Sequence, residues 1–263
     1  MLQAVIFDFD GTIAPTSYRQ EKWFKFYSDI HRKEWPFKDF EEFMVFYNHQ
    51  CCLNGGVQNV YDKLELPCNM KDRNHPVWPA YLEFNKNNPT GLYEGMKDTI
   101  EQIWEFGQLT KDPKRNRRLR LGINTTNSWG SICKDLKEQN VLKYFDSFVT
   151  EETLRQYQGA GDSEPLKKPA KVSLALILGL MGSEGSHVLH VGDTHNDLLA
   201  SQKVIKLNPL KPETLITVGA CYGYEGREKL EKGSETHEGE HVYFDYLIDT
   251  PSELVDLVKK YLE

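Results

Sequence analysis

The sequence has few cysteines, no excess of positive charge and no long apolar run. None of its five cysteines forms a C-x-x-C pair, and at 263 residues the chain does not need disulfides to hold a core. Both facts disfavour a disulfide framework and a structural zinc site, and they favour a reducing, cytoplasmic setting. The formal net charge of −7 argues against nucleic-acid and membrane-surface partners, which attract basic proteins.

Several sequence signals are also missing. The longest apolar stretch, about 172–181, is too short to cross a bilayer, and the N-terminal segment reaches an acid at Asp8 without the basic region of a signal peptide. No G-x-G-x-x-G follows a predicted strand and no G-x-S-x-G occurs, which disfavours a dinucleotide site and a serine hydrolase. The basic stretch 114–120 is interpreted as a solvated loop and the entry to a strand rather than as a polyanion site. Whether the protein is a monomer or a homodimer stays open.

Short apolar runs that end in polar residues recur along the chain. Six of them have the composition of strands: 4–7, 119–123, 145–149, 187–191, 215–218 and 243–248. Helical patterns separate them, for example at 96–106 and 171–180. Strands that alternate with helices predict an α/β fold with a Rossmann-like parallel sheet and right-handed crossovers. The Glu- and Ser-rich segment 233–239 is expected to be a surface loop.

Residues 16–88 lack this alternation. Aromatic residues recur there at helical spacing, first at Trp23, Phe26 and Tyr27 and then from Phe40 onward. The pattern predicts an all-helical insert whose aromatic stripes form its own core. The expected organisation is therefore a catalytic core made of 1–15 and 89–263, with a helical domain at 16–88.

Acidic residues follow two of the predicted strands. Asp8 and Asp10 end the first strand, and because they are two apart on an extended chain both carboxylates can face one ligand. Asp193 and Asp197 follow the strand at 187–191. The carboxyl ends of parallel strands meet at one edge of a sheet, so we expect these acids to lie together. Converging carboxylates need a cation, and Mg²⁺ is the ion normally shared with phosphate substrates.

Other residues near the acids suit an anion. Gly11 and Thr12 allow a sharp turn that presents backbone N–H groups. Lys168 and the hydroxyl of Thr126 add donors for phosphate oxygens. Two neighbours stay open as alternatives for these donor roles, namely Thr125 for Thr126 and Lys167 for Lys168.

Four motifs in order carry a resemblance to a known family. They are Asp8-Phe9-Asp10-Gly11-Thr12, Thr126-Asn127, Lys168-Pro169 and the stretch from Gly192 to Asp197. Together they cover nearly the whole chain and resemble the haloacid dehalogenase superfamily. The place of the insert is similar to that of the helical cap in its phosphoglycolate phosphatase and β-phosphoglucomutase branch.

The resemblance implies roles for single residues. Asp8 would be the nucleophile and Asp10 the general acid and base, while Thr126 and Lys168 would stabilise charge on the transferring group. The implied ligands of Mg²⁺ are Asp8, the carbonyl of Asp10, Asp193 and Asp197, the last either directly or through water. The implied substrate-binding residues in the core are Gly11, Thr12 and Asn127. A cap loop at Asn54, Gly55 and Gly56 is a further candidate, and it is equally well interpreted as a plain turn between helices.

The implied activity is a Mg²⁺-dependent phosphatase that acts on a small phosphorylated metabolite, such as phosphoglycolate or a sugar phosphate. Asp10 separates phosphoryl transfer from dehalogenation, because the dehalogenases lack this second acid. A phosphomutase or a phosphonatase of the same family remains an alternative. So does a non-catalytic module that uses an aspartyl-phosphate as a switch.

Overall fold

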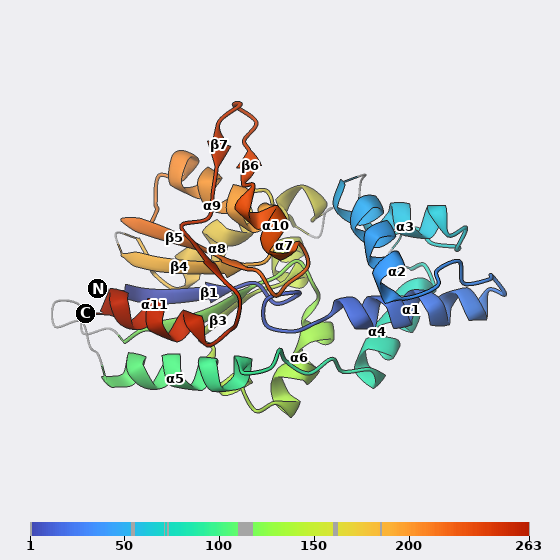
Figure 1. The fold of residues 1–263 in the computed structure, drawn as a ribbon, viewed down its shortest axis with the longest axis horizontal. Helices are drawn as coiled ribbons and strands as arrows, with labels where there is room; N and C mark the ends of the chain where they lie inside the picture. Colours follow the sequence, from blue (N-terminus) through green and yellow to red (C-terminus); the bar gives the residue numbers. More distant parts are fainter. Residues whose placement is uncertain are drawn as a thin grey trace. The chain divides into compact units, whose positions relative to one another are not determined.

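The computed structural model describes residues 2–53, 56–70, 72, 74–109, 118–159, 163–184 and 186–262. The chain divides into two compact units, and Figure 1 colours them along the sequence. Unit 1 comprises Met1–Pro15 and Gly91–Glu263, and unit 2 comprises Thr16–Thr90. Among the described residues, none of the helices combines the length and the apolar character that a bilayer-spanning helix needs.

Unit 1 is built on a six-stranded sheet in the order β3-β2-β1-β4-β5-β8, in which every neighbouring pair is parallel. The parallel α/β class predicted from the sequence is confirmed. The strands are β1 (Leu2–Phe7), β2 (Arg120–Asn124), β3 (Ser147–Val149), β4 (His187–Gly192), β5 (Thr214–Ala220) and β8 (Tyr246–Ile248).

Helices cover both faces of this sheet, which is why its central strands consist mostly of apolar residues. On one face α5 (Met96–Leu109), α6 (Trp129–Glu138) and α11 (Glu253–Leu262) pack on side chains such as Val5 and Phe7. On the other face α7 (Glu151–Tyr157), α8 (Val172–Leu180) and α9 (His195–Leu207) pack on Ala4 and Ile6. Burial on both faces produces the continuous apolar runs that identified the strands.

The strand order reverses direction at β1. From β1 the chain moves outward through β2 to β3, and then returns to place β4 on the other side of β1. Ligands of open α/β sheets bind at the carboxyl ends of the strands beside such a reversal. The polar residues after β1, β2 and β4 therefore lie where the topology favours a site.

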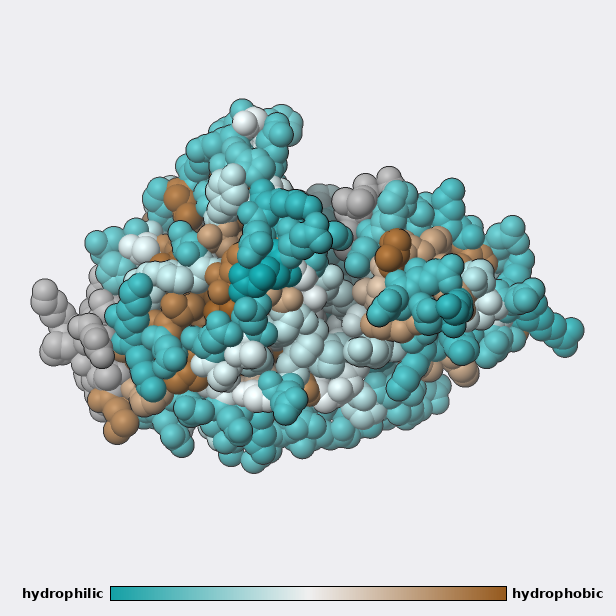
Figure 2. Space-filling model, viewed as in Figure 1, coloured by the Kyte–Doolittle hydropathy of each residue, from teal (hydrophilic) through white to brown (hydrophobic). Residues whose placement is uncertain are grey.

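Two sequence expectations in this unit need correction. The strand expected at 243–248 begins only at Tyr246, because the Asp245 carboxylate instead accepts hydrogen bonds from Thr217 N (2.7 Å) and Thr217 Oγ1 (2.9 Å). The loop expected at 233–239 contains a strand, because β6 (Ser234–Glu235) pairs antiparallel with β7 (His241–Val242). Figure 2 shows hydrophilic residues over this hairpin, which explains why its composition suggested a loop.

Unit 2 is helical in its described residues, with α1 (Ser17–Ile30), α2 (Phe40–Tyr47), a π-helical turn (Asn48–Leu53), α3 (Val57–Lys63) and α4 (Val77–Asn87). Its core is aromatic. Trp23 is fully buried, its ring stacks on Tyr27 with centroids 4.9 Å apart, and its Nε1 donates to the Tyr61 hydroxyl at 2.6 Å. The aromatic stripes of the sequence thus pack against one another inside this unit.

The chain leaves unit 1 and re-enters it at neighbouring points. The backbone N–H of Tyr93, just after the return, donates to the carbonyl of Ile13, just before the departure, at 3.1 Å. The two ends of the unit 2 segment are therefore joined to neighbouring points of unit 1.

Candidate active site

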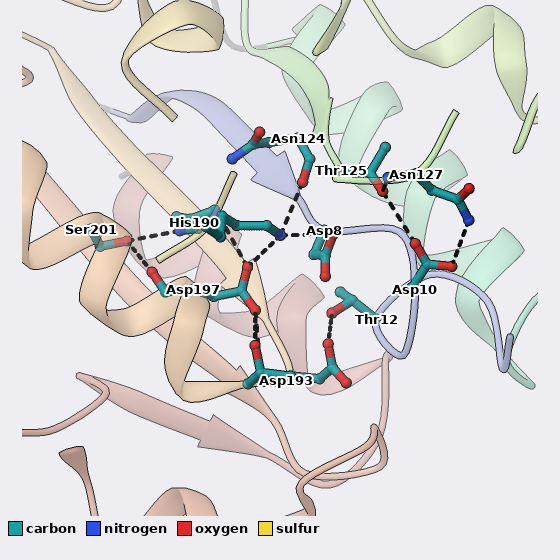
Figure 3. A network of polar contacts seen from close by, with 12 residues as sticks. Asp8, Asp10, Thr12, Asn124, Thr125, Asn127, His190, Asp193, Asp197 and Ser201 are labelled. Atoms are coloured by element: carbon teal, nitrogen blue, oxygen red, sulfur yellow. Dashed lines mark hydrogen bonds and ion pairs between the residues drawn. The ribbon is translucent and has the colours of Figure 1, made fainter. Parts of the chain in front are cut away.

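Three carboxylates converge at the reversal point of the sheet. Asp8 ends β1, and Asp193 and Asp197 lie on the loop and first turn after β4; each offers an oxygen within 4.8 Å of the others. All three residues are buried. Figure 3 shows their side chains around one point, with the strand ends behind them. Asp10, expected in the same group, does not turn its carboxylate into it.

Lys168 lies between two of these acids. Its Nζ is 2.8 Å from Asp8 Oδ1 and 2.6 Å from Asp197 Oδ1, and it also donates to the Asn124 carbonyl at 3.2 Å. The side chain of Lys168 is only 5% exposed, so these contacts are shielded from solvent. Lys167 instead pairs with Glu164 at the surface. Of the two lysines that the sequence left open, the structure brings Lys168 to the acids.

The Asp10 carboxylate faces the loop after β2. It accepts hydrogen bonds from Thr125 Oγ1 at 3.2 Å and from Asn127 Nδ2 at 3.1 Å. The Thr125 oxygen also accepts from the backbone N–H of Asn127 at 3.0 Å. The hydroxyl of Thr126, by contrast, makes no hydrogen bond to any described residue. The structure thus brings Thr125 and Asn127, rather than Thr126, into the network.

Close packing fixes Asp193. Its Oδ1 accepts from Thr12 Oγ1 at 3.1 Å, and its Oδ2 accepts from the backbone N–H of Tyr224 at 2.8 Å. A Cβ atom at Gly11, where φ is +77°, would come within 2.0 Å of Asp193 Oδ2, and one at Gly223 would come within 2.4 Å of the Gly11 carbonyl. Gly11 is therefore required by the close approach of Asp193 as well as by its left-handed backbone.

Asp197 is held from two sides. Its Oδ2 accepts from Thr194 Oγ1 at 2.8 Å and from Thr194 N at 3.3 Å, which forms a capping arrangement at the start of α9. Its Oδ1 accepts from Lys168. Burial alone would raise the pKa of this carboxyl, but the Lys168 ammonium reverses the effect and holds the pKa below its usual value. Asp197 therefore stays ionised beside the lysine.

The other two acids are harder to ionise than free carboxyl groups. Burial raises the pKa of Asp8 from 3.8 to about 7, against the lowering effect of Lys168, and the charges of Asp197 and Asp10 add to the rise. Burial and the neighbouring Asp8 raise the pKa of Asp193 well above its usual value. One lysine therefore does not balance three adjacent carboxylates, and a further cation would.

The chemistry of the cluster fits Mg²⁺. Its donors are all carboxylate oxygens, which this hard ion prefers, and they are close enough to share one ion. The raised pKa values indicate a deficit of positive charge at the same point. Asp8, Asp193 and Asp197 are the side chains that could hold it.

Part of the predicted site belongs to unit 2 or lies outside the described residues. Asn54 and Gly55 of the expected specificity loop lie outside the described residues, as does most of the basic stretch, at 114–117. Gly56 lies in unit 2 directly before α3, with φ of +90° and open space where a Cβ would project.

Some residues of the site were missed by sequence reasoning. His190 is a polar residue inside the otherwise apolar run of β4, and this break in the pattern is its signal in the sequence. Burial lowers its pKa to about 4, so the ring is neutral. Tyr224 contacts Asp193 through its backbone N–H, and Gly223 leaves room for Asp193 because it has no side chain. The sequence by itself indicates neither contribution.

A family model described as "Haloacid dehalogenase-like hydrolase" matches residues 5–205 of the chain. This span includes the three converging acids, Lys168 and the whole of unit 2.

Individual proteins agree with this match. The chain is 24% identical over 167 residues to a phosphoglycolate phosphatase of Vibrio parahaemolyticus, covering 64% of this chain and 56% of that protein. It is 21% identical over 202 residues to the pyrophosphatase PpaX of Oceanobacillus iheyensis, covering 77% and 79%. The solved structure of YfnB from Bacillus subtilis bound to magnesium has a TM-score of 0.63 at 14% identity, covering 98% of each chain. Such a structural likeness supports the fold alone.

Proposed function

The chain belongs to the haloacid dehalogenase-like hydrolases, and from this membership we propose that it is a Mg²⁺-dependent phosphatase with Asp8 as its nucleophile. The observation that carries the proposal is the buried cluster of Asp8, Asp193 and Asp197 with Lys168 between two of its members. Relatives named as phosphatases and pyrophosphatases support the reaction class.

The first step forms an aspartyl-phosphate. A carboxylate oxygen of Asp8 attacks phosphorus, the bond from phosphorus to the ester oxygen breaks, and Asp10 gives its proton to the leaving oxygen. Asp10 suits this role because neutral donors, Thr125 and Asn127, hold its carboxylate apart from the three clustered acids. The acid and the nucleophile therefore occupy different environments although they are two residues apart.

The second step frees the nucleophile. Asp10, now ionised, removes a proton from a water molecule as its oxygen attacks phosphorus, and the bond from phosphorus to Asp8 breaks. Inorganic phosphate leaves, and both acids return to their starting states. Dividing one displacement into two lowers the barrier that each must cross.

Charge on the transferring group needs donors in both steps. Lys168 supplies an ammonium that Asp8 and Asp197 already hold in place, and such preorganised charge is effective in a buried site. We assign the hydroxyl donor to Thr125, because its side chain is buried beside Asp10. Asp8, Asp193, Asp197 and the Asp10 carbonyl would hold Mg²⁺, which when bound offsets the repulsion between Asp8 and a phosphate dianion.

The substrate we propose is a small phosphorylated metabolite, either phosphoglycolate-like or a sugar phosphate. Unit 2 would act as the cap that selects it, with 12–16 and 87–91 as hinges. A cytoplasmic setting forms part of this proposal, and it is supported by the free thiols of Cys68, Cys133 and Cys221.

The test is a phosphate-release screen over phosphoglycolate, sugar phosphates and pyrophosphate, with Mg²⁺ and with excess chelator. We expect turnover only with the metal, and a loss of more than about a thousandfold in Asp8→Asn, whose amide is a poor nucleophile. A matched Asp146→Asn variant, which changes an acid outside the cluster, should keep its activity. Full activity in Asp8→Asn would refute the mechanism.

The alternatives predict other outcomes of the same screen. A phosphomutase would convert a sugar phosphate to its isomer with little net phosphate release. A phosphonatase would release phosphate only from a phosphonate, and a switch module would be labelled once and stay phosphorylated.

A further inference from the structure

His190 interrupts an apolar face of the sheet. It lies on β4 opposite Ile6 of β1, and the strand neighbours of this pair, Ala4 and Val188, belong to the apolar core beneath α8 and α9. The ring is only 1% exposed. A buried polar side chain at a position suited to an apolar one calls for a specific reason.

The contacts of the ring fix which nitrogen carries the proton. Ser201 Oγ donates its single proton to the Asp197 carbonyl, one helical turn earlier in α9, at 3.0 Å. The same oxygen lies 2.8 Å from His190 Nδ1, so it accepts a hydrogen bond from the N–H at that position. Nε2 is then left as a bare acceptor. It is buried and has no hydrogen-bond partner among the described residues.

This bare nitrogen faces the acid that holds Lys168. His190 Nε2 lies 3.9 Å from Asp197 Oδ1, the oxygen that accepts from Lys168 Nζ at 2.6 Å. Figure 3 shows this sequence of side chains, from Ser201 through His190 and Asp197 toward Asp8. Because Nε2 offers no proton, Oδ1 gains no donor from the ring that would compete with Lys168.

We propose that His190 is a positioning residue for Lys168, acting through Asp197. The imidazole fills the space behind Oδ1 with an acceptor, which keeps that oxygen directed at the lysine. Lys168 is thereby held toward Asp8. Ser201 contributes by holding the ring in the orientation and tautomer that leave Nε2 bare.

The kinetic consequence rests on the proposed phosphatase function. Small displacements of a charged catalytic group cost rate more than they cost substrate binding, because its charge matters most in the transition state. His190→Asn keeps a polar group near Ser201 and deletes the Nε2 position. We expect kcat about tenfold lower, with KM changed less than about twofold.

Two variants separate positioning from general damage to the fold. His190→Gln places an amide oxygen near the Nε2 position, and we expect it to recover most of the lost kcat. His187→Asn makes the same change on the same strand, at a histidine whose Nε2 lies 3.8 Å from Glu213, away from the site. We expect its kcat to match that of the unaltered chain.

A second readout does not depend on turnover. The buried Lys168 ammonium should give a slowly exchanging ¹H–¹⁵N NMR signal, assigned by its loss in Lys168→Arg. We expect the signal to shift or broaden in His190→Asn, to do so less in Ser201→Ala, and to stay unchanged in His187→Asn. If His190→Asn does not fold, Ser201→Ala and His190→Gln carry the test.

The proposal is overturned if His190→Asn leaves kcat and the Lys168 signal unchanged, or if His190→Gln is as impaired as His190→Asn. Absence of phosphate release from the unaltered chain would remove the proposed function instead. The NMR comparison would then still decide whether His190 positions Lys168.

Discussion

Burial has opposite effects on stability in two regions of the molecule. One is the carboxylate edge of unit 1, which consists of Asp8, Asp193 and Asp197, and the other is the aromatic core of unit 2. At the carboxylate edge, burial and the mutual repulsion of the acids raise the pKa values of Asp8 and Asp193, which is unfavourable for stability and suits the proposed cation site. In unit 2, buried rings pack on one another around Trp23 and contribute stability.

Buried charge and packed aromatic rings differ in how specifically they indicate a chemical function. Crowded charge is chemically specific, because few arrangements other than a metal or phosphate site require it. Packed aromatic rings are generic, because many sequences can build such a core. The chemistry proposed for this protein therefore rests on the acids of unit 1 and not on the aromatic core of unit 2.

The largest expected effect on stability comes from a substitution in the core of unit 2. Trp23→Ala removes a fully buried ring and its bond to Tyr61, and should cost about 3–5 kcal/mol in the free energy of unfolding. Denaturant titration measures the loss. Trp78→Ala, which truncates a partly exposed ring of the same unit, should cost less than half as much.

The informative control is Mg²⁺ binding by Trp23→Ala under conditions where unit 1 stays folded. If the edge is a self-sufficient site, its affinity for the ion should be unchanged. A large loss of affinity would mean that the chemistry of the edge depends on the packing of unit 2.

A finer test concerns the two threonines after β2. Thr125→Val keeps the shape of the side chain but removes the hydroxyl that contacts Asp10, and should lower kcat about 10- to 100-fold. Thr126→Val should change kcat less than about twofold. Steady-state kinetics of the two variants decide between them, and the reverse result would restore Thr126 as the phosphate donor.

The smallest expected effect is the pH dependence of stability that arises from protonation of Asp8. The Asp8 carboxyl keeps its proton up to about pH 7 when folded but loses it near 3.8 when unfolded. Between these values the unfolded state binds fewer protons, so this group makes the metal-free protein less stable as pH rises. Mg²⁺ requires ionised ligands, and its stabilising effect should therefore grow with pH.

Thermal unfolding with and without millimolar Mg²⁺ measures this effect. We expect Tm to rise by about 5 °C at pH 8 and by less than about 2 °C at pH 5. Asp193→Asn should remove the difference between the two pH values. An equal rise at both pH values would contradict the raised pKa of Asp8 and with it the crowding argument.

Much of the fold followed from the sequence because each central strand is buried on both faces. Burial on both faces favours continuous apolar runs such as 4–7, and the acid that follows this run, Asp8, marks the end of the strand. The edge strand β8 is shorter than the sequence predicts. It is less buried than the central strands, and the Asp245 carboxylate accepts the hydrogen bond of the Thr217 backbone N–H.

The site was only partly predictable for a different reason. The roles proposed for Asp8 and Lys168 belong to their side chains, so the residue types themselves indicate these roles. The choice of Thr125 over Thr126 depends on which way each side chain points, and the role of Tyr224 belongs to its backbone. Neither kind of information is written in a single sequence.

The hydrogen bond between Tyr93 and Ile13 has a consequence for how such proteins diversify. Since departure and return are adjacent, a short linker joining Pro15 to Gly91 should close unit 1 without disturbing its sheet. The helical segment is in this sense a replaceable module. An exchange of this segment for one of another length would leave the sheet of unit 1 and its cluster of acids unchanged.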